Sequence, residues 1–398
     1  MARENPDDIL VVGGGVFGAA GALALARRGH RVTLLDPGPL PHELAASTDI
    51  SKVIRMDYGA DVFYMELMEV ALDGWRAWNL EMSRPLYHET GFLLLSRQPL
   101  AAGGYEYESL QLLVTRGHHP DRLTGGQLKA RFPAWSRGGF VDGYFNPEGG
   151  WAESAEVVGW LIESCLQAGV TVQSGRRVGE LIMADGRVAG VRTSEGDDLR
   201  AGWVVVAAGA WTAKLVPSLA DRIKSVGQPV FHFRASDVLS SFQPPAFVPW
   251  AADISTTGWY GFSALDNGLF KLANHGPGIP ADPDAPRGIE PGTEARFRRF
   301  LKESLPDLAG APLAGSRLCL YCDSWDGDFY IDRDPAHEGL VVATGGSGHG
   351  FKFAPVLGGL IADAVEGVSN PYRHRFAWRP RAEETHEEAR FAVPSSKN

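Results

Sequence analysis

The N-terminal segment carries three glycines at the spacing Gly-x-Gly-x-x-Gly between two short apolar runs, and this feature restricts the fold more than any other. The first run, residues 9–12, leads into the glycines, and an Ala/Leu-rich stretch, residues 19–28, follows them. The second run ends in an acid, Asp36. This order is typical of a strand, a glycine turn, a helix and a second strand. The glycines are Gly13, Gly15 and Gly18.

Each glycine has a separate use in a dinucleotide-binding turn. The first allows the tight turn, the second lets a pyrophosphate approach the helix N-terminus, and the third lets helix and strand pack closely. The acid Asp36 can accept hydrogen bonds from a ribose. A purely structural turn is the alternative, but the strand, helix and acid around the glycines favour a dinucleotide. The motif alone does not distinguish NAD from FAD.

Later segments look like further pieces of the same lobe. The apolar spacing of residues 154–168 predicts a helix that stops at Gly169. Strands are predicted at residues 170–172, in residues 203–212, where a buried strand runs into small residues, and at the start of residues 339–353, and a further helix at residues 356–365. Because these pieces come from the start, middle and end of the chain, the lobe must be discontinuous in sequence.

We therefore predict an α/β (α+β) fold of two lobes. The segments between the dinucleotide pieces alternate apolar and polar residues, are rich in aromatics and prolines, and contain one long helical pattern, at residues 293–305. They predict a mainly antiparallel sheet. The predicted ranges are 1–85, 150–215 and 325–378 for the dinucleotide lobe, 86–149 and 216–324 for the substrate lobe, and 379–398 for a charged surface tail.

Charge and cysteine content narrow the function classes. Lys and Arg total 38 and Asp and Glu 48, a formal net charge of −10, which argues against nucleic acid and anionic membranes as partners. Three cysteines in 398 residues are too few for a disulfide framework. No stretch reaches the roughly 18 unbroken apolar residues of a membrane span. We expect a cytoplasmic protein with no membrane segment.

Three later motifs, taken with the N-terminal unit, resemble one family. They are residues 208–212 (Ala-Gly-Ala-Trp-Thr), residues 317–323 (Arg-Leu-Cys-Leu-Tyr-Cys-Asp) and residues 346–353 (Gly-Ser-Gly-His-Gly-Phe-Lys-Phe). The chain resembles the FAD-dependent amine oxidases of the monomeric sarcosine oxidase type, which include N-methyltryptophan oxidase, pipecolate oxidase and the fructosyl-amino-acid oxidases, or amadoriases. The resemblance runs over nearly the whole chain and implies FAD rather than NAD. The cofactor-binding positions that the motifs and the resemblance imply are Gly13, Gly15, Val16, Phe17, Gly18, Asp36, Lys52, Ala208, Gly209, Trp211, Gly346, Gly348, His349, Gly350, Phe351 and Lys352.

The resemblance also implies that Cys319 is joined through its sulfur to the 8α-methyl carbon of the flavin. Such a tether would fix the ring system and raise its potential. The alternatives for the pair Cys319 and Cys322 are a metal knuckle, a redox dithiol or two inert buried cysteines. A structural zinc site would need a second pair of ligands. No role is assigned to Cys322.

Six residues are candidates for catalysis. Lys271 lies in an otherwise apolar strand, where a lysine is costly to bury unless something holds its charge. By resemblance it sits against the flavin and promotes the reaction with oxygen electrostatically; the alternative is a lysine on the solvent face of an edge strand. Arg55 and Lys352 would, by resemblance, bind the substrate carboxylate, which suits a guanidinium and an ammonium. Tyr321, Tyr260 and His275 would line the pocket.

The chain mixes features of two branches of this family. Lys52 stands where sarcosine oxidases have an arginine, while residues 49–54 and Cys322 are closer to the amadoriases. His275 stands where amadoriases have an acid, as it does in sarcosine oxidases. The amine is therefore left open among sarcosine-like substrates, imino acids and fructosyl amino acids.

The resemblance implies an oxidase of secondary amines. Hydride would pass from the substrate α-carbon to flavin N5, the imine would hydrolyse, and O2 would be reduced to H2O2. The alternatives are a dehydrogenase with another electron acceptor and a flavin-binding partner subunit without its own turnover. The expected partners are a small-molecule amine and O2, and the expected state is a monomer or a small homo-oligomer.

Overall fold

The glycine turn follows the first strand of a mainly parallel sheet. The computed structural model describes residues 8–383, 385 and 389–391, and within them six strands pair in the order β20-β21-β13-β1-β2-β9. All pairs are parallel except β20 with β21. The strands are β1 Asp8–Val12, β2 Arg31–Asp36, β9 Thr171–Ser174, β13 Trp203–Val206, β20 Tyr330–Arg333 and β21 Leu340–Thr344. The predicted α/β fold class is confirmed.

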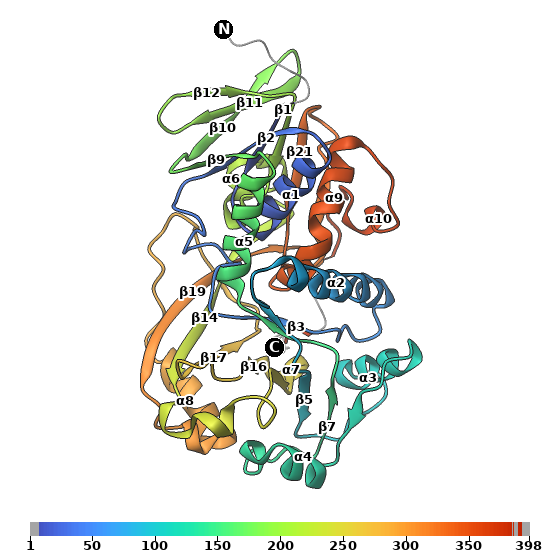
Figure 1. The fold of residues 1–398 in the computed structure, drawn as a ribbon, viewed down its shortest axis with the longest axis vertical. Coiled ribbons are helices and arrows are strands. Elements are labelled where there is room, and N and C mark those ends of the chain that lie inside the picture. The colour runs from blue at the N-terminus through green and yellow to red at the C-terminus, as the bar shows by residue number, and fades with distance from the viewer. Residues whose placement is uncertain (1–7, 384, 386–388, 392–398) are drawn as a thin grey trace, which may run out of the picture.

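Helices pack against one face of this sheet and a small antiparallel sheet packs against the other, because buried parallel strands need partners on both faces. Helix α1 follows the glycine turn and contacts both α5 and α9. In Figure 1 these helices lie with the six-stranded sheet in the upper half of the molecule. Their bounds are α1 Val16–Arg27, α5 Ser154–Gln167 and α9 Ala354–Glu366, close to the predicted helices. A separate antiparallel sheet lies beside them, formed by β10 Val178–Ala184, β11 Arg187–Thr193 and β12 Asp198–Arg200.

A second large sheet joins nine strands of the described chain and occupies the lower half of Figure 1. Eight follow the order β18-β14-β17-β16-β15-β5-β7-β6, and β19 pairs with β14. Its pairs are antiparallel except β5 with β15. The strands are β5 Phe92–Ser96, β6 Asp121–Arg122, β7 Asp142–Asn146, β14 Ile223–Arg234, β15 Trp250–Ala252, β16 Trp259–Gly261, β17 Leu269–Asn274, β18 Ile279–Pro280 and β19 Leu313–Ser324.

The register of this sheet places several candidate residues on one face. Cys319 on β19 pairs with Gln228 on β14, and Lys271 on β17 pairs with His232 on the same strand. Side chains two residues apart on a strand share a face. The candidates brought to this face are Tyr260, Lys271, Cys319 and Tyr321. The opposite face packs aromatic residues of the sheet against helix α8, Thr293–Ser304.

A small sheet links the two halves. Strand β3, Lys52–Ile54, pairs with β8, Gly150–Ala152, which also pairs with β4, Tyr87–His88. Strand β3 carries Lys52 and ends immediately before Arg55. Both candidate residues are therefore held by backbone pairing between the two large sheets.

Some helices were not predicted. Helix α2, Val62–Glu81, lies beside α9, and α3, Tyr105–Thr115, and α4, Gly125–Arg131, lie in the segment predicted to be mainly sheet. The shorter helices are α6 Thr212–Leu215, α7 Ile254–Thr257 and α10 Arg373–Phe376.

The expected surface tail differs from the structure where the chain is described. Ala389 and Arg390 are buried, and Thr385 donates a backbone hydrogen bond to Trp325. An arginine can be buried when its charge is paired, and Arg390 forms an ion pair with Asp323. Residues 1–7 of the predicted first lobe, and residues 384, 386–388 and 392–398 of the predicted tail, lie outside the described residues.

Candidate functional site

A long cleft of about 1730 Å³ runs along the edge of the six-stranded sheet where its strands end. It is lined by thirteen of the predicted cofactor-binding residues: Gly13, Gly15, Val16, Phe17, Asp36, Lys52, Ala208, Gly209, Trp211, Gly346, Gly348, Gly350 and Phe351. Four others lie elsewhere. His349 and Lys352 line a neighbouring pocket, Gly18 packs beneath the turn against Gly13, and Cys319 packs with Val226 and Tyr321.

The glycine turn and Asp36 form one end of this cleft. Gly13 has φ +106°, and a Cβ there would lie 2.5 Å from the carbonyl oxygen of Ala207, so the turn requires glycine. The Asp36 carboxylate accepts hydrogen bonds from the backbone N–H groups of Gly14 at 2.7 Å and Gly38 at 3.0 Å. Burial raises the pKa of Asp36, while these two amides oppose the rise. The loop is thereby fixed around a buried acid at the end of β2.

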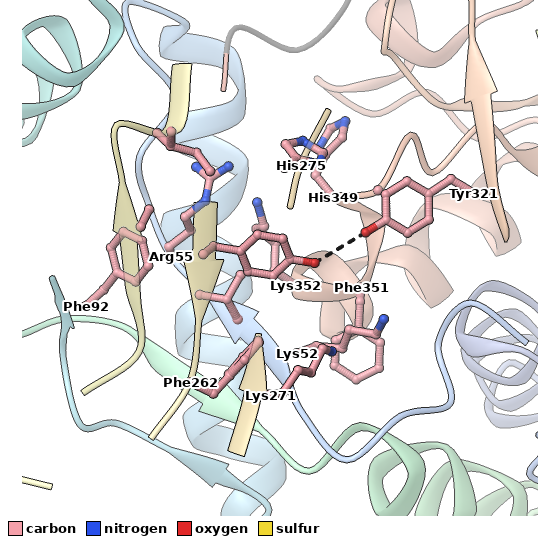
Figure 2. A pocket seen from close by; sticks show the side chains of 15 residues that line it. Lys52, Arg55, Phe92, Phe262, Lys271, His275, Tyr321, His349, Phe351 and Lys352 are labelled. Carbon is pink, nitrogen blue, oxygen red and sulfur yellow. Dashed lines mark hydrogen bonds between the residues drawn. The ribbon is translucent and has the colours of Figure 1, made fainter. Parts of the chain in front are cut away.

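A second, smaller pocket of about 620 Å³ adjoins the cleft (Figure 2). All six predicted catalytic residues line it: Arg55, Tyr260, Lys271, His275, Tyr321 and Lys352. Lys52, Tyr321, Gly348 and Phe351 line both cavities, so the two spaces meet at these side chains. A group that extended along the cleft would reach the pocket at this junction.

Lys271 is the most deeply buried cation of the pocket, with 1% of its surface exposed. Its ammonium lies 2.7 Å from Asp49 Oδ2 and donates to the carbonyl oxygen of Ser51 at 2.6 Å. Burial lowers the pKa of Lys271 to about 8, with Asp49 opposing the shift and Lys52 adding to it. The lysine is therefore inside the fold and paired, which excludes the alternative of a lysine on a solvent-facing edge.

Asp49 is the partner that makes this burial possible. Its Oδ1 also lies 3.0 Å from His232 Nε2, on the strand that pairs with β17. Burial raises the pKa of Asp49, but Lys271 and His232 outweigh burial and hold it well below its usual range. Asp49 and Lys271 therefore form a charged pair at neutral pH.

Arg55 and Lys352 line the pocket from two elements (Figure 2). Each also donates a hydrogen bond to a tyrosine hydroxyl. The Arg55 guanidinium donates to the hydroxyl of Tyr105 at 2.8 Å and to the backbone carbonyl of Asp57. The Lys352 ammonium donates to the hydroxyl of Tyr58 at 3.0 Å. These bonds direct two cations at one side of the pocket, an arrangement that suits a carboxylate.

The opposite side of the pocket carries two phenols and an imidazole. The hydroxyls of Tyr260 and Tyr321 lie 3.5 Å apart, and burial raises the pKa of both, so both are neutral hydrogen-bonding groups at neutral pH. Gly348 has φ +80°, and a Cβ there would lie 2.4 Å from the Tyr321 ring and 3.1 Å from His275 Cε1. Only glycine lets this loop approach both rings.

Cys319 and Cys322 lie on opposite faces of β19, as a separation of three residues requires. Cys319 packs with Val226 and Tyr321, whereas Cys322 packs in a separate cluster under the six-stranded sheet. The pair cannot share a metal ion or act as a dithiol in this geometry, and the described residues contain no group of three or more metal-ligating side chains. Burial raises the pKa of Cys322 to about 11, which leaves it an inert thiol.

Cys319 is 1% exposed, and its sulfur lies 3.9 Å from the carbonyl oxygen of Ala46. Ala46 lines the cleft, whereas Cys319 is not among the described residues that do. Cys319 therefore lies one layer behind the cleft wall, covered by the loop that contains Ala46.

A sequence profile of the FAD dependent oxidoreductase family matches residues 8–364. The chain belongs to this family. It is 27% identical to the monomeric sarcosine oxidase of Bacillus sp. (strain B-0618) over 359 residues, 89% of this chain and 91% of that protein. It is 29% identical to N-methyl-L-tryptophan oxidase of Salmonella enteritidis PT4 over 372 residues, 92% of this chain and 96% of that protein.

The fold is likewise shared with a solved oxidase of this FAD-dependent kind. Fructosamine oxidase (Amadoriase II) from Aspergillus fumigatus superimposes with a TM-score of 0.85 at 26% identity, over 97% of this chain and 94% of that one. These comparisons bear out the predicted family resemblance. The protein is an FAD-dependent oxidoreductase of the sarcosine, N-methyl amino acid and fructosyl amino acid oxidase kind.

The cleft of this FAD-dependent oxidoreductase fits its cofactor. A strand, a glycine turn and the N-terminus of the 12-residue helix α1 form the site type that binds a pyrophosphate. Asp36 suits a ribose, and the wall opens into the small pocket at Tyr321 and Gly348. No helix in the described part of the chain is long and apolar enough to cross a membrane.

Several residues of the site were not identified from the sequence. Asp49, Tyr58 and Tyr105 each contact one of the three buried cations, Lys271, Lys352 and Arg55 respectively. Ser47 accepts a hydrogen bond from the backbone N–H of Val16 at the start of α1. Arg390 reaches Asp323 and the carbonyl oxygen of Ser347 from the C-terminal segment. Asp49 opens the stretch 49–54 that resembles the amadoriases, but no role was predicted for it, and each of these residues is brought to the site by the tertiary fold.

Proposed function

We propose that this protein is an FAD-dependent oxidase of secondary amines that carry a carboxylate, such as N-substituted amino acids. The observation that carries the proposal is the lining of the small pocket. Arg55 and Lys352 face it together, and none of the fifteen described lining residues is an acid. A carboxylate is attracted to such a pocket, and a free cation is repelled.

The two cations would bind the substrate carboxylate from different elements. Arg55 can grip it through a planar guanidinium, and Lys352 adds a point charge. Both are buried, so their attraction is screened less than that of surface cations. This binding would place the α-carbon of the substrate toward the junction with the cofactor cleft.

The amine would bind in its neutral form. Two phenols and the imidazole of His275 offer hydrogen bonds without a negative charge, so the pocket does not stabilise an ammonium ion. Bound FAD would accept a hydride equivalent from the α-carbon and pass two electrons to O2, giving H2O2, while the imine product hydrolyses to a carbonyl compound and an amine. The neutral amine holds the lone pair that the forming imine needs.

Lys271 would assist the reaction with oxygen. It is a buried cation whose position is fixed by Asp49 and the carbonyl group of Ser51 before any reaction occurs. A fixed charge in a site that excludes water stabilises negative charge as it develops on oxygen. Lys271 would therefore affect the rate of the oxidative half-reaction, whereas Arg55 would affect the affinity for the substrate.

We also propose that FAD is attached through Cys319. The thiol faces the same side of the sheet as Tyr321, next to the junction of the two cavities. For attachment, the loop around Ala46 must move aside, since it covers the sulfur. Acid-precipitated wild type should keep its yellow colour, and Cys319→Ser should release it; release from both would contradict the attachment.

An anaerobic titration tests the function itself. The yellow holoenzyme is mixed without oxygen with sarcosine, other N-methyl amino acids, pipecolate, saccharopine and fructosyl amino acids, and then exposed to air. Bleaching followed by stoichiometric peroxide supports the proposal. Bleaching without rapid reoxidation in air would identify a dehydrogenase, and no bleaching by any amine would favour a partner subunit.

The carboxylate requirement has its own control. Each substrate that bleaches the flavin is compared with its primary amide, which keeps the amine and the α-carbon but removes the negative charge. Arg55→Met should weaken binding of the acid far more than of the amide. Equal weakening would mean that Arg55 does not bind the carboxylate.

A further inference from the structure

Tyr58 lies beneath two cations of the pocket, Arg55 and Lys352, and does not itself line the pocket among the described residues. It follows β3 by four residues and is 3% exposed. Its hydroxyl oxygen lies 3.0 Å from Lys352 Nζ and 3.0 Å from His349 Nδ1. We propose that Tyr58 is the positioning residue that orients Lys352 toward the substrate carboxylate, an inference that rests on the proposed carboxylate binding.

The direction of each hydrogen bond follows from the chemistry of the groups. His349 Nε2 lies 3.0 Å from the backbone carbonyl oxygen of Gly327, which can only accept, so Nε2 carries the proton. The Lys352 ammonium can only donate, so the Tyr58 oxygen accepts from it. The Tyr58 proton is then donated to the unprotonated Nδ1 of His349. The hydrogen bonds from Lys352 through Tyr58 and His349 to Gly327 thus run in one direction, each with one donor and one acceptor.

This chain fixes the tip of a long side chain whose base is already held. Trp75 Nε1 donates to the backbone carbonyl of Lys352 at 2.7 Å. A lysine ammonium rotates freely on a flexible stem unless a partner restrains it. With the backbone held by Trp75 and the ammonium held by Tyr58, the remaining N–H groups have a defined direction before a substrate arrives.

The ring of Tyr58 also supports both cations. Lys352 Nζ lies 4.6 Å from the ring centroid, and the Arg55 guanidinium carbon lies 5.4 Å from it. Both distances fall within the range at which an aromatic ring attracts a cation. Two like charges repel, so a shared neutral support lowers the cost of holding them close to one another.

The ring and the hydroxyl can be separated by substitution. Tyr58 packs parallel to Tyr64, with ring centroids 4.9 Å apart and planes at 15°. Tyr58→Phe keeps this packing and the contact with both cations, and it removes the hydroxyl that accepts from Lys352 and contacts His349 Nδ1. Tyr64→Phe is the matched control, since Tyr64 lies in the same aromatic cluster, whereas the Lys352 ammonium donates to Tyr58.

The experiment compares holoenzymes of wild type, Tyr58→Phe, Lys352→Met, the double variant and Tyr64→Phe. The probes are sarcosine and its primary amide, and the binding constant of each comes from anaerobic flavin reduction at varied concentration. Tyr58→Phe should lower the preference for acid over amide by about tenfold, the usual size of a hydrogen bond to a charged group. The limiting rate of flavin reduction should change much less, and Tyr64→Phe should change neither quantity.

The double variant identifies the path of the effect. If Tyr58 acts through Lys352, then Tyr58→Phe should have no further effect on the preference once Lys352 is Met. Full additivity, or an unchanged preference in Tyr58→Phe, would overturn the inference while leaving the proposed function intact. An unchanged preference in Lys352→Met would instead overturn the proposed role of Lys352 and the inference with it.

A second measurement does not depend on turnover. Nitrogen NMR of the labelled imidazole of His349 should show Nε2 protonated and Nδ1 unprotonated in the wild-type holoenzyme. In Tyr58→Phe the Nδ1 resonance should shift, because it loses its donor. A protonated Nδ1 in the wild type would contradict the hydrogen-bond chain.

Discussion

The charge on Lys271 can be varied by pH, and the proposed oxygen reaction should follow it. Burial lowers the pKa of Lys271 to about 8, so the lysine is charged below this pH and neutral above it. The charged form outnumbers the neutral form about ten to one at pH 7, and the ratio is reversed at pH 9. If only the charged form assists, the rate constant for reoxidation by O2 should fall about tenfold between these two values.

Neighbouring charges should move this transition in opposite directions. Asp49 raises the pKa of Lys271 and Lys52 lowers it. Asp49→Asn removes the stabilising charge, so the transition should move below its wild-type pH. Lys52→Met removes a repulsive charge, so the transition should move above it. Lys271→Met should remove the transition and leave a low rate at every pH.

The assay separates the two half-reactions. The holoenzyme is reduced anaerobically with one equivalent of a bleaching amine and then mixed with oxygenated buffers from pH 6 to pH 10, and return of the flavin absorbance is followed by stopped flow. Flavin reduction is measured over the same range as the control. A reoxidation rate that stays constant between pH 7 and pH 9, or a shift of the same sign in Asp49→Asn and Lys52→Met, would refute the reasoning.

Three further outcomes are expected. Asp36→Ala leaves the buried backbone amide of Gly14 without its acceptor, at a cost of about 1–3 kcal/mol, and removes the acceptor of the half-buried Gly38 amide; it should lower both the FAD content and the melting temperature of the purified protein. Arg55→Met should raise the KM for a carboxylate substrate by about 10–100-fold, because hydrogen bonds to charged groups contribute roughly 1.5–3 kcal/mol. An equal rise in the KM for the amide would argue against carboxylate binding by Arg55. Arg390→Met leaves Asp323 buried without its partner, so the free energy of unfolding, measured by urea denaturation, should fall by about 3–5 kcal/mol. The double variant Arg390→Met with Asp323→Asn should recover part of this loss.

The dinucleotide lobe was predictable because its signals are local. Strand, turn and helix follow one another within residues 8–36, and each glycine is explained by its neighbours. The later strands were found because buried parallel strands are continuous apolar runs. Helix α2 was overlooked although Tyr64, Met68 and Trp75 have helical spacing and are buried. The helical spacing of these apolar residues is visible in the sequence itself.

The C-terminal segment was misjudged for a different reason. Its composition is charged and poor in apolar residues, which ordinarily indicates solvent exposure. Arg390 is nevertheless 6% exposed, because it pairs with Asp323 on β19, 67 residues earlier in the chain. The composition of a segment indicates that burying its charges is costly, but it does not show which distant residue pairs with a buried charge.

The same argument separates the residues of the site that were found from those that were missed. A lysine within an apolar strand shows that a partner must exist, so Lys271 was noticed from its own surroundings. The partner Asp49 lies 222 residues earlier and is selected by the register that sets His232 beside Lys271. A shift of one residue in the pairing of β14 with β17 would turn one of these two side chains to the opposite face. The ionisation of Lys271 thus depends on a sheet pairing that no local motif encodes, so the pH profile of reoxidation tests the fold as well as the chemistry.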